Sequence, residues 1–139
     1  MNLTVSREKL DTALGQKVSN LLGTVNDIPL VECTERHYFG PSLYIKEVTM
    51  PAGALIVGKV HKVEHMCIML TGRMILVQED GTRTELVAPA TFVAKPGRKV
   101  AYIIETTIFQ NIYSTDETDV EKLENMFVDN SKNLLEEGN

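Results

Sequence analysis

Residues 53–72 read GALIVGKVHKVEHMCIMLTG, and this stretch places two histidines on either side of a short polar bend. His61 ends one run of β-branched residues and His65 begins the next, with Lys62, Val63 and Glu64 between them. In a β-hairpin, residues at such positions can point from neighbouring strands towards one inner face. Because neutral imidazole is the commonest metal ligand among protein side chains, the pair predicts one end of a ligand or metal site.

Short runs rich in Val, Ile, Thr and Tyr continue on both sides of this stretch. Turn-forming residues separate them, and Asp80-Gly81 is the strongest hairpin signal because this dipeptide tolerates the positive φ of tight turns. Many short strands with frequent turns predict an antiparallel sandwich or barrel, not βαβ units. The predicted strands are 42–50, 54–61, 65–71, 74–78, 84–87, 91–94, 100–105 and 107–113.

Two segments outside these strands have a helical pattern. Apolar residues recur at spacings of three and four over 10–22, which predicts a short N-terminal helix that begins at Ser6. Near the C-terminus, Asp116 or Thr118 can cap a helix carrying Val120 and Leu123. We therefore expect a single domain with an N-terminal helical arm (1–37), a barrel (38–115) and a C-terminal helix and tail (116–139).

Composition narrows the classes of partner. The 139 residues are 43% hydrophobic and 24% charged, which suits one soluble domain with its own core. With a net charge of -5 and no Lys/Arg-rich run, the chain is a poor nucleic-acid binder. No apolar stretch approaches the roughly 20 residues that cross a bilayer, and the N-terminus lacks a secretory h-region. Cys33 and Cys67 are too few for a disulfide framework, so we expect a cytoplasmic protein that binds neither nucleic acid nor membranes.

The opening stretch resembles the first sequence motif of the cupin superfamily, which reads Gly, five residues, His-x-His, three or four residues, Glu, six residues and Gly. With Gly72 as the last glycine, His65 takes the glutamate position, His61 the second histidine and Lys59 the first. The resemblance implies an all-β cupin-type double-stranded β-helix, a jelly-roll barrel, whose metal-ligand set is depleted.

Residues 88–97 resemble the second cupin motif, which puts Val100 at its histidine position and Ile104 at its asparagine position. Three further segments are similar to small cupin-like proteins of tailed bacteriophages: KEVTMPAG (46–53), ATFVAKPGRK (90–99) and TDETDVEKLE (115–124). This second resemblance implies an accessory phage protein located in the host cytoplasm.

Side-chain parity extends the expected pocket beyond the histidine pair. Two-residue steps along the strands from His61, His65 and Val100 give the predicted inner wall: Lys59, His61, His65, Cys67 and Tyr102. If a divalent metal such as zinc, iron, manganese or nickel is the cofactor, His61 and His65 supply two of its ligands. The Lys59 ammonium repels a cation and favours a small anionic ligand instead.

Two functions remain open at this point. The first is a non-catalytic binding or accessory protein whose pocket captures a small anion. The alternative is a metal-dependent small-molecule enzyme of the isomerase, lyase or dioxygenase type that uses His61 and His65. Val100 in place of a motif histidine favours the first, and the two histidines could also be ordinary half-exposed residues at a barrel mouth. We also expect a homodimer, because the apolar segments 10–22 and 120–127 would gain burial by docking on a second copy.

Overall fold

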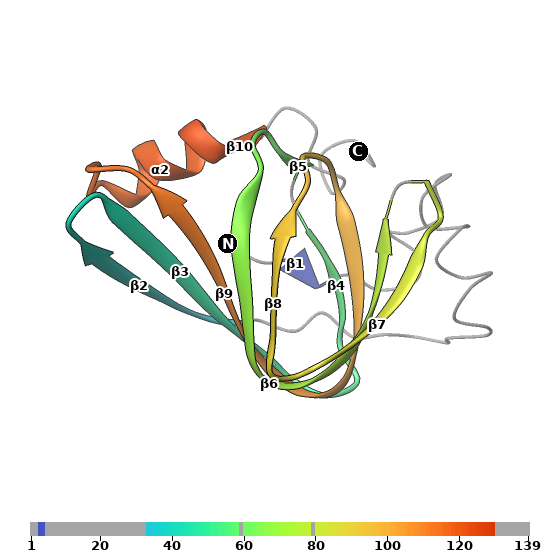
Figure 1. Ribbon diagram of the computed structural model, residues 1–139. Coiled ribbons are helices and arrows are strands. Elements are labelled where there is room, and N and C mark those ends of the chain that lie inside the picture. The colour runs from blue at the N-terminus through green and yellow to red at the C-terminus, as the bar shows by residue number, and fades with distance from the viewer. Residues whose placement is uncertain (1–2, 5–32, 59, 79, 130–139) are drawn as a thin grey trace.

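Antiparallel strands make up most of the structure (Figure 1), a computed structural model that describes residues 3–4, 33–58, 60–78 and 80–129. The strands are β1 (Leu3–Thr4), β2 (Thr34–Gly40), β3 (Leu43–Met50), β4 (Leu55–Val57), β5 (Val60–His61), β6 (His65–Gln78), β7 (Arg83–Val87), β8 (Ala90–Ala94), β9 (Lys99–Ser114) and β10 (Val128–Asp129). The described part of the chain contains one helix, α2 (Val120–Phe127). The all-β prediction is therefore confirmed.

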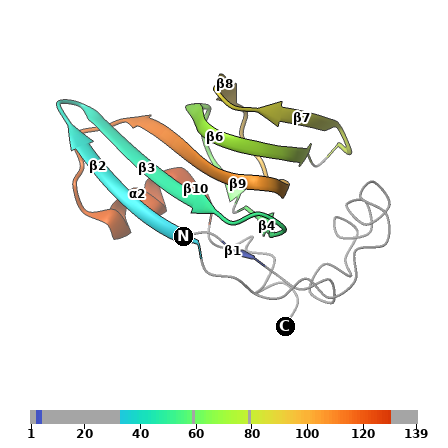
Figure 2. The same cartoon turned by 90° about the horizontal axis from the view of Figure 1, so that it is seen from below.

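The two longest strands, β6 and β9, pair with each other along most of their length and organise the large sheet. β9 also pairs with β3 and β4, whereas β6 also pairs with β7 and β8. Register shifts between Met69 and Met74 mark bulges in β6, and bulges bend a strand. The sheet consequently curves, with β2 and β3 on one side and β6, β7 and β8 on another (Figure 2).

Every second side chain along these strands points into the interior and helps to fill it. Met69 and Ile103 are fully buried in a cluster that also contains Val48 and Met74. On the opposite face of the same sheet, register places Val57, Val100 and Val77 in one row, and each is at most 1% exposed. This part of the sheet is thus apolar on both faces, as expected of continuous Val- and Ile-rich strands.

α2 packs across one end of the sheet. Asp119 caps it, and the Asp119 carboxylate accepts a hydrogen bond from the backbone N–H of Lys122 at 3.2 Å. The prediction that Asp116 or Thr118 caps this helix was wrong. Asp116 instead accepts a hydrogen bond from the Ser42 hydroxyl at 3.0 Å, which ties the approach to the helix to the β2–β3 turn.

Apolar packing holds α2 in place. Its one buried residue, Leu123, is 1% exposed and contacts Tyr44 and Tyr113. Phe127, at the end of the helix, stacks on Tyr113 with ring centroids 4.2 Å apart. No helix in the described ranges is long or apolar enough to cross a bilayer.

Strand pairing begins earlier and continues longer than the sequence indicates. β2 starts at Thr34, ahead of the expected start of the barrel at residue 38. The predicted runs 65–71 and 74–78 merge into β6, and 100–105 and 107–113 merge into β9, because Gly72 lies in a bulge and not in a turn. The hairpin at Asp80-Gly81 is confirmed between β6 and β7. The predicted helix over 6–22 and the tail 130–139 lie outside the described residues.

We expect Gly72→Ala to destabilise the protein far more than Gly81→Ala. The two glycines have similar positive φ values of 94° and 87°, so the backbone penalty of about 1 kcal/mol is shared. A Cβ at Gly72 would lie 2.7 Å from the Thr107 Cα and would also overlap the Thr106 carbonyl, whereas a Cβ at Gly81 meets nothing within 4 Å. Urea unfolding should show a loss of about 1 kcal/mol for Gly81→Ala and at least about 3 kcal/mol for Gly72→Ala. Equal losses would contradict the close approach of β6 to β9 at the bulge.

Candidate functional site

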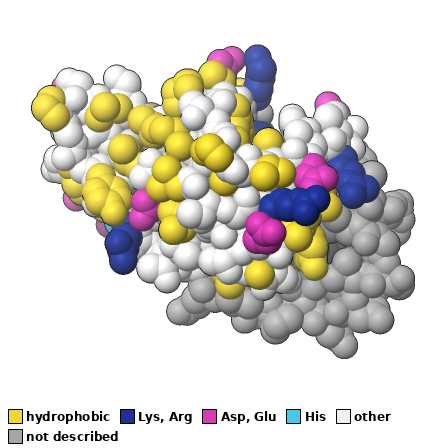
Figure 3. Space-filling view, turned by 60° about the horizontal axis from the view of Figure 1, so that its bottom comes forward, with side chains coloured by type: hydrophobic (Ala, Val, Ile, Leu, Met, Phe, Trp, Pro, Cys, Tyr) yellow, Lys and Arg dark blue, Asp and Glu magenta, His cyan; other side chains and the backbone are white. Residues whose placement is uncertain are grey.

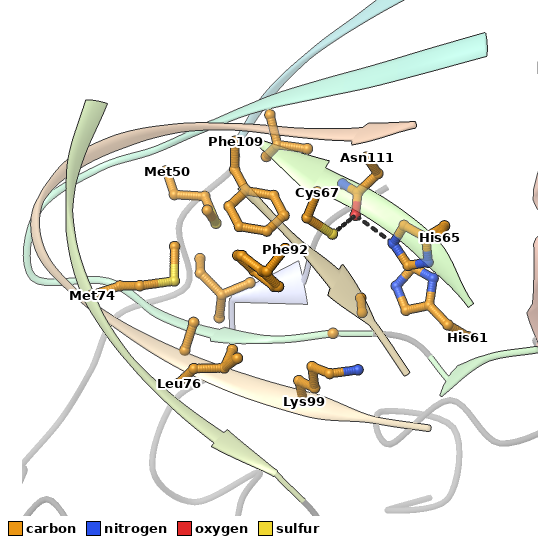
Figure 4. A pocket seen from close by; sticks show the side chains of 15 residues that line it. Met50, His61, His65, Cys67, Met74, Leu76, Phe92, Lys99, Phe109 and Asn111 are labelled. Carbon is orange, nitrogen blue, oxygen red and sulfur yellow. Dashed lines mark hydrogen bonds between the residues drawn. The ribbon is translucent and has the colours of Figure 1, made fainter. Parts of the chain in front are cut away.

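A cavity of about 110 Å³ lies inside the barrel, and its wall has two unlike ends (Figure 4). The apolar end consists of aliphatic, methionine and phenylalanine side chains: Val48, Met50, Ile56, Met74, Leu76, Phe92, Ala94, Ala101 and Phe109. The other end carries the polar and sulfur-bearing groups: His61, His65, Cys67, Lys99 and Asn111. The site can therefore take a molecule that is itself polar at one end and apolar at the other.

The two histidines lie together at the polar end. Backbone hydrogen bonds of 3.0 Å in both directions between His61 and Gly97 hold β5, and β10 pairs on its other side. His65 opens β6 and is 7% exposed. The imidazole rings stack, with centroids 4.7 Å apart and planes 29° from parallel. The hairpin bend therefore brings both rings to the same cavity.

Asn111 on β9 forms hydrogen bonds with His65 and Cys67, which both lie on β6. Its Oδ1 lies 2.9 Å from Nε2 of His65 and accepts a weaker hydrogen bond from the Cys67 thiol at 3.7 Å. The other nitrogen of His65, Nδ1, lies 3.3 Å from the carbonyl oxygen of Val63. A carbonyl oxygen and Oδ1 can only accept, so His65 can satisfy both partners fully only as an imidazolium.

Burial sets the charge of this wall. Burial first, and then the nearby His65 and Lys99, lower the pKa of His61 to about 3. Burial also lowers the pKa of His65, although the hydrogen bonds to Asn111 and Val63 oppose this shift. The imidazoles are consequently uncharged at neutral pH.

Cys67 and Lys99 are the other ionisable residues at the polar end of the cavity. Burial raises the pKa of Cys67 to about 12, even though Lys99 lowers it, so the thiol stays protonated. Lys99 lines the cavity and donates a hydrogen bond from Nζ to the Lys95 carbonyl at 2.6 Å. Among the lining residues that the structure describes, Lys99 is the one cation.

The predicted pocket residues divide into three groups. His61, His65 and Cys67 line the cavity. Tyr102 does not, because β9 turns Lys99 and Ala101 inwards, while Tyr102 is half-buried between Leu55 and Ile75 in the adjoining strands. Lys59 lies outside the described residues.

The error at Tyr102 has a simple origin. A register one residue away from the expected one moves every side chain of a strand to the other face. The Pro96-Gly97 turn indicates that a strand follows, but it does not fix which residue of that strand points inwards. The cation that points inwards is therefore Lys99. It belongs to a basic cluster at a turn, and the side chains of such clusters usually point into solvent.

Sequence reasoning missed Asn111 and the two phenylalanines Phe92 and Phe109. A signal for Asn111 was available, because asparagine is depleted in strands and this one alternates with apolar residues at 109 and 113. The phenylalanines carry no comparable signal, since any inward phenylalanine is compatible with an ordinary core.

The polar wall does not fit a divalent metal. The described ranges contain no group of three or more His, Cys, Asp or Glu side chains that could hold an ion. His61 Nδ1 faces the Tyr113 hydroxyl at 3.2 Å, and both nitrogens of His65 face other partners. The neighbouring Cys67 is a protonated thiol, and the neighbouring Lys99 is a cationic residue. Both oppose the binding of a metal cation.

Comparison with known proteins gives the fold. No protein-family model and no curated protein matches the sequence. Among solved structures, the chain is similar to a double-stranded β-helix protein of Klebsiella pneumoniae, with a TM-score of 0.52 and 19% identity over 63% of this chain and 76% of that one. It is also similar to an RmlC-like cupin of Methanocaldococcus jannaschii, with a TM-score of 0.50 and 14% identity over 67% and 86%. The chain has the cupin fold.

A third cupin-fold neighbour is KdgF from a Halomonas species, with a TM-score of 0.51 and 16% identity over 65% of this chain and 84% of that one. At these identities the likeness extends to the double-stranded β-helix and not to the activity. The cupin fold implied by the motifs is therefore confirmed.

The neutral histidines of the cavity predict that stability falls at acid pH. The pKa of His61 is about 3 in the folded state and about 6.5 in an unfolded chain. As the pH falls below about 6.5 the unfolded state binds the proton first, so the free energy of unfolding declines by up to about 1.4 kcal/mol per pH unit for this histidine. Urea unfolding at several pH values should show a shallower decline for His61→Gln.

His37→Gln is the matched control, because it removes a histidine outside the cavity and leaves His61 in place. It should keep the steeper decline of the unsubstituted protein. A His61→Gln protein with the same pH dependence as His37→Gln would show that His61 is protonated in the folded state.

Proposed function

We propose that this cupin is a binding protein for a small organic anion with an apolar body, such as an aromatic or branched carboxylate, held without a metal. The observation that carries the proposal is the two-ended cavity, with Lys99, Asn111 and two uncharged imidazoles opposite a wall of methionine, isoleucine and phenylalanine. Charge-assisted hydrogen bonds to a carboxylate are about twice as strong as neutral ones, so the charged end would orient the ligand.

The apolar end suits a body of about the size of one ring. The whole cavity, polar end included, has a volume of about 110 Å³, somewhat below the roughly 150 Å³ of a cavity that accepts benzene in another protein, so the ligand body can be no larger than about one ring. Phe92 and Phe109 meet edge to face, with centroids 5.9 Å apart, and offer flat apolar surface. Met50 and Met74 are flexible enough to adjust to the outline of a ligand.

The polar end would respond to a bound anion. A carboxylate near His65 raises the pKa of that imidazole, because an opposite charge favours the protonated form. The imidazolium could then donate to Asn111 and Val63 at once, which the neutral ring cannot do. Binding of the anion would thus be coupled to uptake of a proton.

The first test is calorimetric titration of the full chain with benzoate. We expect Lys99→Met to weaken binding by about tenfold or more, because it removes the cation of the wall and keeps its apolar stem. Lys95→Met is the matched control, since the Lys95 side chain is 75% exposed and does not line the cavity. Equal affinity of the two variants, or binding of benzamide as tight as that of benzoate, would exclude an anion site at Lys99.

A second test follows from the coupling to protonation. The affinity for benzoate should rise between pH 8 and pH 6, because the pKa of His65 is lowered in the free protein and raised in the complex. Titrations in buffers of different ionisation enthalpy should report proton uptake, and His65→Gln should abolish it. A pH-independent affinity would contradict the role given to His65.

The alternative is a metal-dependent isomerase, lyase or dioxygenase that uses His61 and His65, and it has the convergence of two imidazoles in its favour. It predicts zinc, iron, manganese or nickel in the purified protein by elemental analysis, lost in both His61→Ala and His65→Ala. The anion-binding proposal predicts that adding these metals leaves the affinity for benzoate unchanged.

An accessory role in a tailed bacteriophage would fit a binding protein without catalysis. This role, and the location in the host cytoplasm that goes with it, rest on the three segments similar to phage cupin-like proteins, and both stay predictions.

A further inference from the structure

His61 borders both the ligand cavity and a second, smaller void. The smaller void, of about 50 Å³, lies between α2 and the barrel, and its wall includes Tyr113 and side chains of α2. Gly58, His61 and Asn111 line both spaces, whereas Tyr113 lines the smaller one and not the cavity. The two nitrogens of an imidazole point in widely different directions, so His61 can use one of them on each side.

The Tyr113 hydroxyl occupies the nitrogen on the side of the smaller void. Its oxygen lies 3.2 Å from Nδ1 of His61, and the described residues give this hydroxyl no other hydrogen-bond partner. Tyr113 is 5% exposed, and burial raises the pKa of its hydroxyl, which therefore keeps its proton. A buried O–H without an acceptor costs free energy. The Tyr113 hydroxyl is consequently the donor of this bond, and Nδ1 of His61 accepts it.

An accepting Nδ1 fixes the tautomer of His61. A neutral imidazole carries its single N–H on one of the two nitrogens, and burial keeps His61 uncharged at neutral pH. Because Nδ1 accepts from Tyr113, the proton lies on Nε2. Nε2 has no hydrogen-bond partner in the part of the chain that the structure describes. This N–H is therefore left for a ligand in the cavity, where His61 and His65 lie side by side (Figure 4).

Asn111 is fixed in the same sense. Its Oδ1 accepts from the Cys67 thiol and lies 2.9 Å from Nε2 of His65, which leaves the two N–H groups of the same amide for other partners. Lys99, which also lines the cavity, can only donate. The polar side chains at this end of the cavity therefore offer N–H donors to a ligand.

We propose that Tyr113, from outside the cavity, holds His61 as the Nε2–H tautomer and so makes it a hydrogen-bond donor to the head group of the bound anion. Tyr113 is thus a positioning residue that determines specificity. A carboxylate only accepts and matches these donors, whereas the N–H groups of an amide would meet N–H groups and leave buried donors unpaired. The role towards a ligand rests on the proposed anion-binding function, but the tautomer is a property of the free protein.

Tyr44 provides a matched control for Tyr113. It is 3% exposed and stacks on Tyr113 with ring centroids 6.0 Å apart. Its hydroxyl lies 2.7 Å from Nδ1 of His37, a histidine that does not line the cavity. Tyr44→Phe therefore removes the same atom from the same aromatic cluster, and it leaves the bond between Tyr113 and His61 intact.

The first test is nitrogen NMR of the imidazole rings in the full chain at about pH 8, where histidines are neutral. Protonated and bare imidazole nitrogens resonate far apart, and His61→Gln identifies the signals of His61 among those of the three histidines. We expect Nε2–H alone in the unsubstituted protein and in Tyr44→Phe, and a mixture of both tautomers in Tyr113→Phe. A proton on Nδ1 in the unsubstituted protein, or a spectrum of His61 that Tyr113→Phe leaves unchanged, would overturn the proposal.

The second test is calorimetric titration of the same proteins with benzoate and with benzamide. If Tyr113→Phe holds the two tautomers in comparable amounts, its affinity for benzoate should fall by about twofold, because only the Nε2–H form donates to the carboxylate. The other form has a bare Nε2 that accepts from the amide N–H, so benzamide should bind more tightly. We expect the ratio of the two affinities to fall by at least about threefold in Tyr113→Phe and to stay constant in Tyr44→Phe. A constant ratio in Tyr113→Phe, or an equal fall in both variants, would contradict the role in specificity.

Weak binding of either probe to the outside of the protein cancels in this comparison. Figure 3 shows apolar side chains spread over one face of the molecule, and Leu43, Leu70 and Val93 are 44%, 45% and 49% exposed. Both substituted tyrosines are buried, so the variants share this surface, and circular dichroism checks that each is folded. If the unsubstituted protein binds neither probe, the proposed function fails and the role of His61 towards a ligand fails with it, whereas the NMR spectrum alone decides the tautomer. If benzoate binds but the spectrum shows Nδ1–H, the proposed function stands and this inference is wrong.

Discussion

The pairing of β6 with β9 is the constraint on which the other features depend. These two long strands pair from Met66–Ile112 at one end to Gln78–Lys99 at the other, and four of the other six described strands of the large sheet, β3, β4, β7 and β8, pair with one of them. Their bulges bend the sheet around the interior, and Gly72 allows the close approach at the bend. The cavity exists because the same pair of strands forms its floor at one end and its polar wall at the other.

The sequence was sufficient for the fold because several independent patterns agree. Alternating Val- and Ile-rich runs, the Asp80-Gly81 hairpin and the cupin-like spacing around Gly72 all indicate an antiparallel barrel. What the sequence could not show is how many turns interrupt the strands. Thr71-Gly72 has the composition of a turn, and only the partner strand decides that it forms a bulge within a continuous β6.

The candidate site was predictable in part for the same reason. His61 and His65 flank a bend, so local geometry alone brings them together. Lys99 and Asn111 come from a distant strand, and their orientation depends on a register that the turn at Gly97 does not determine. The second cupin motif accordingly led to Val100, whereas the residue that faces the cavity is its neighbour Lys99. The inward Lys99 thus lies next to the position, Val100, that the resemblance assigns to a metal-binding histidine.

Because β6 and β9 line the cavity with one face and carry Met66 and Ile112 on the other, a one-residue insertion in their paired halves exchanges the two faces. A single residue added between His65 and Met69 would turn cavity-lining side chains of this strand towards the surface and surface side chains towards the cavity. The bulge near Gly72 is where one additional residue can be absorbed without exchanging the two faces. Changes of chain length during the evolution of this barrel should therefore concentrate at that bulge and in the loops, while the paired half of each strand changes by substitution alone.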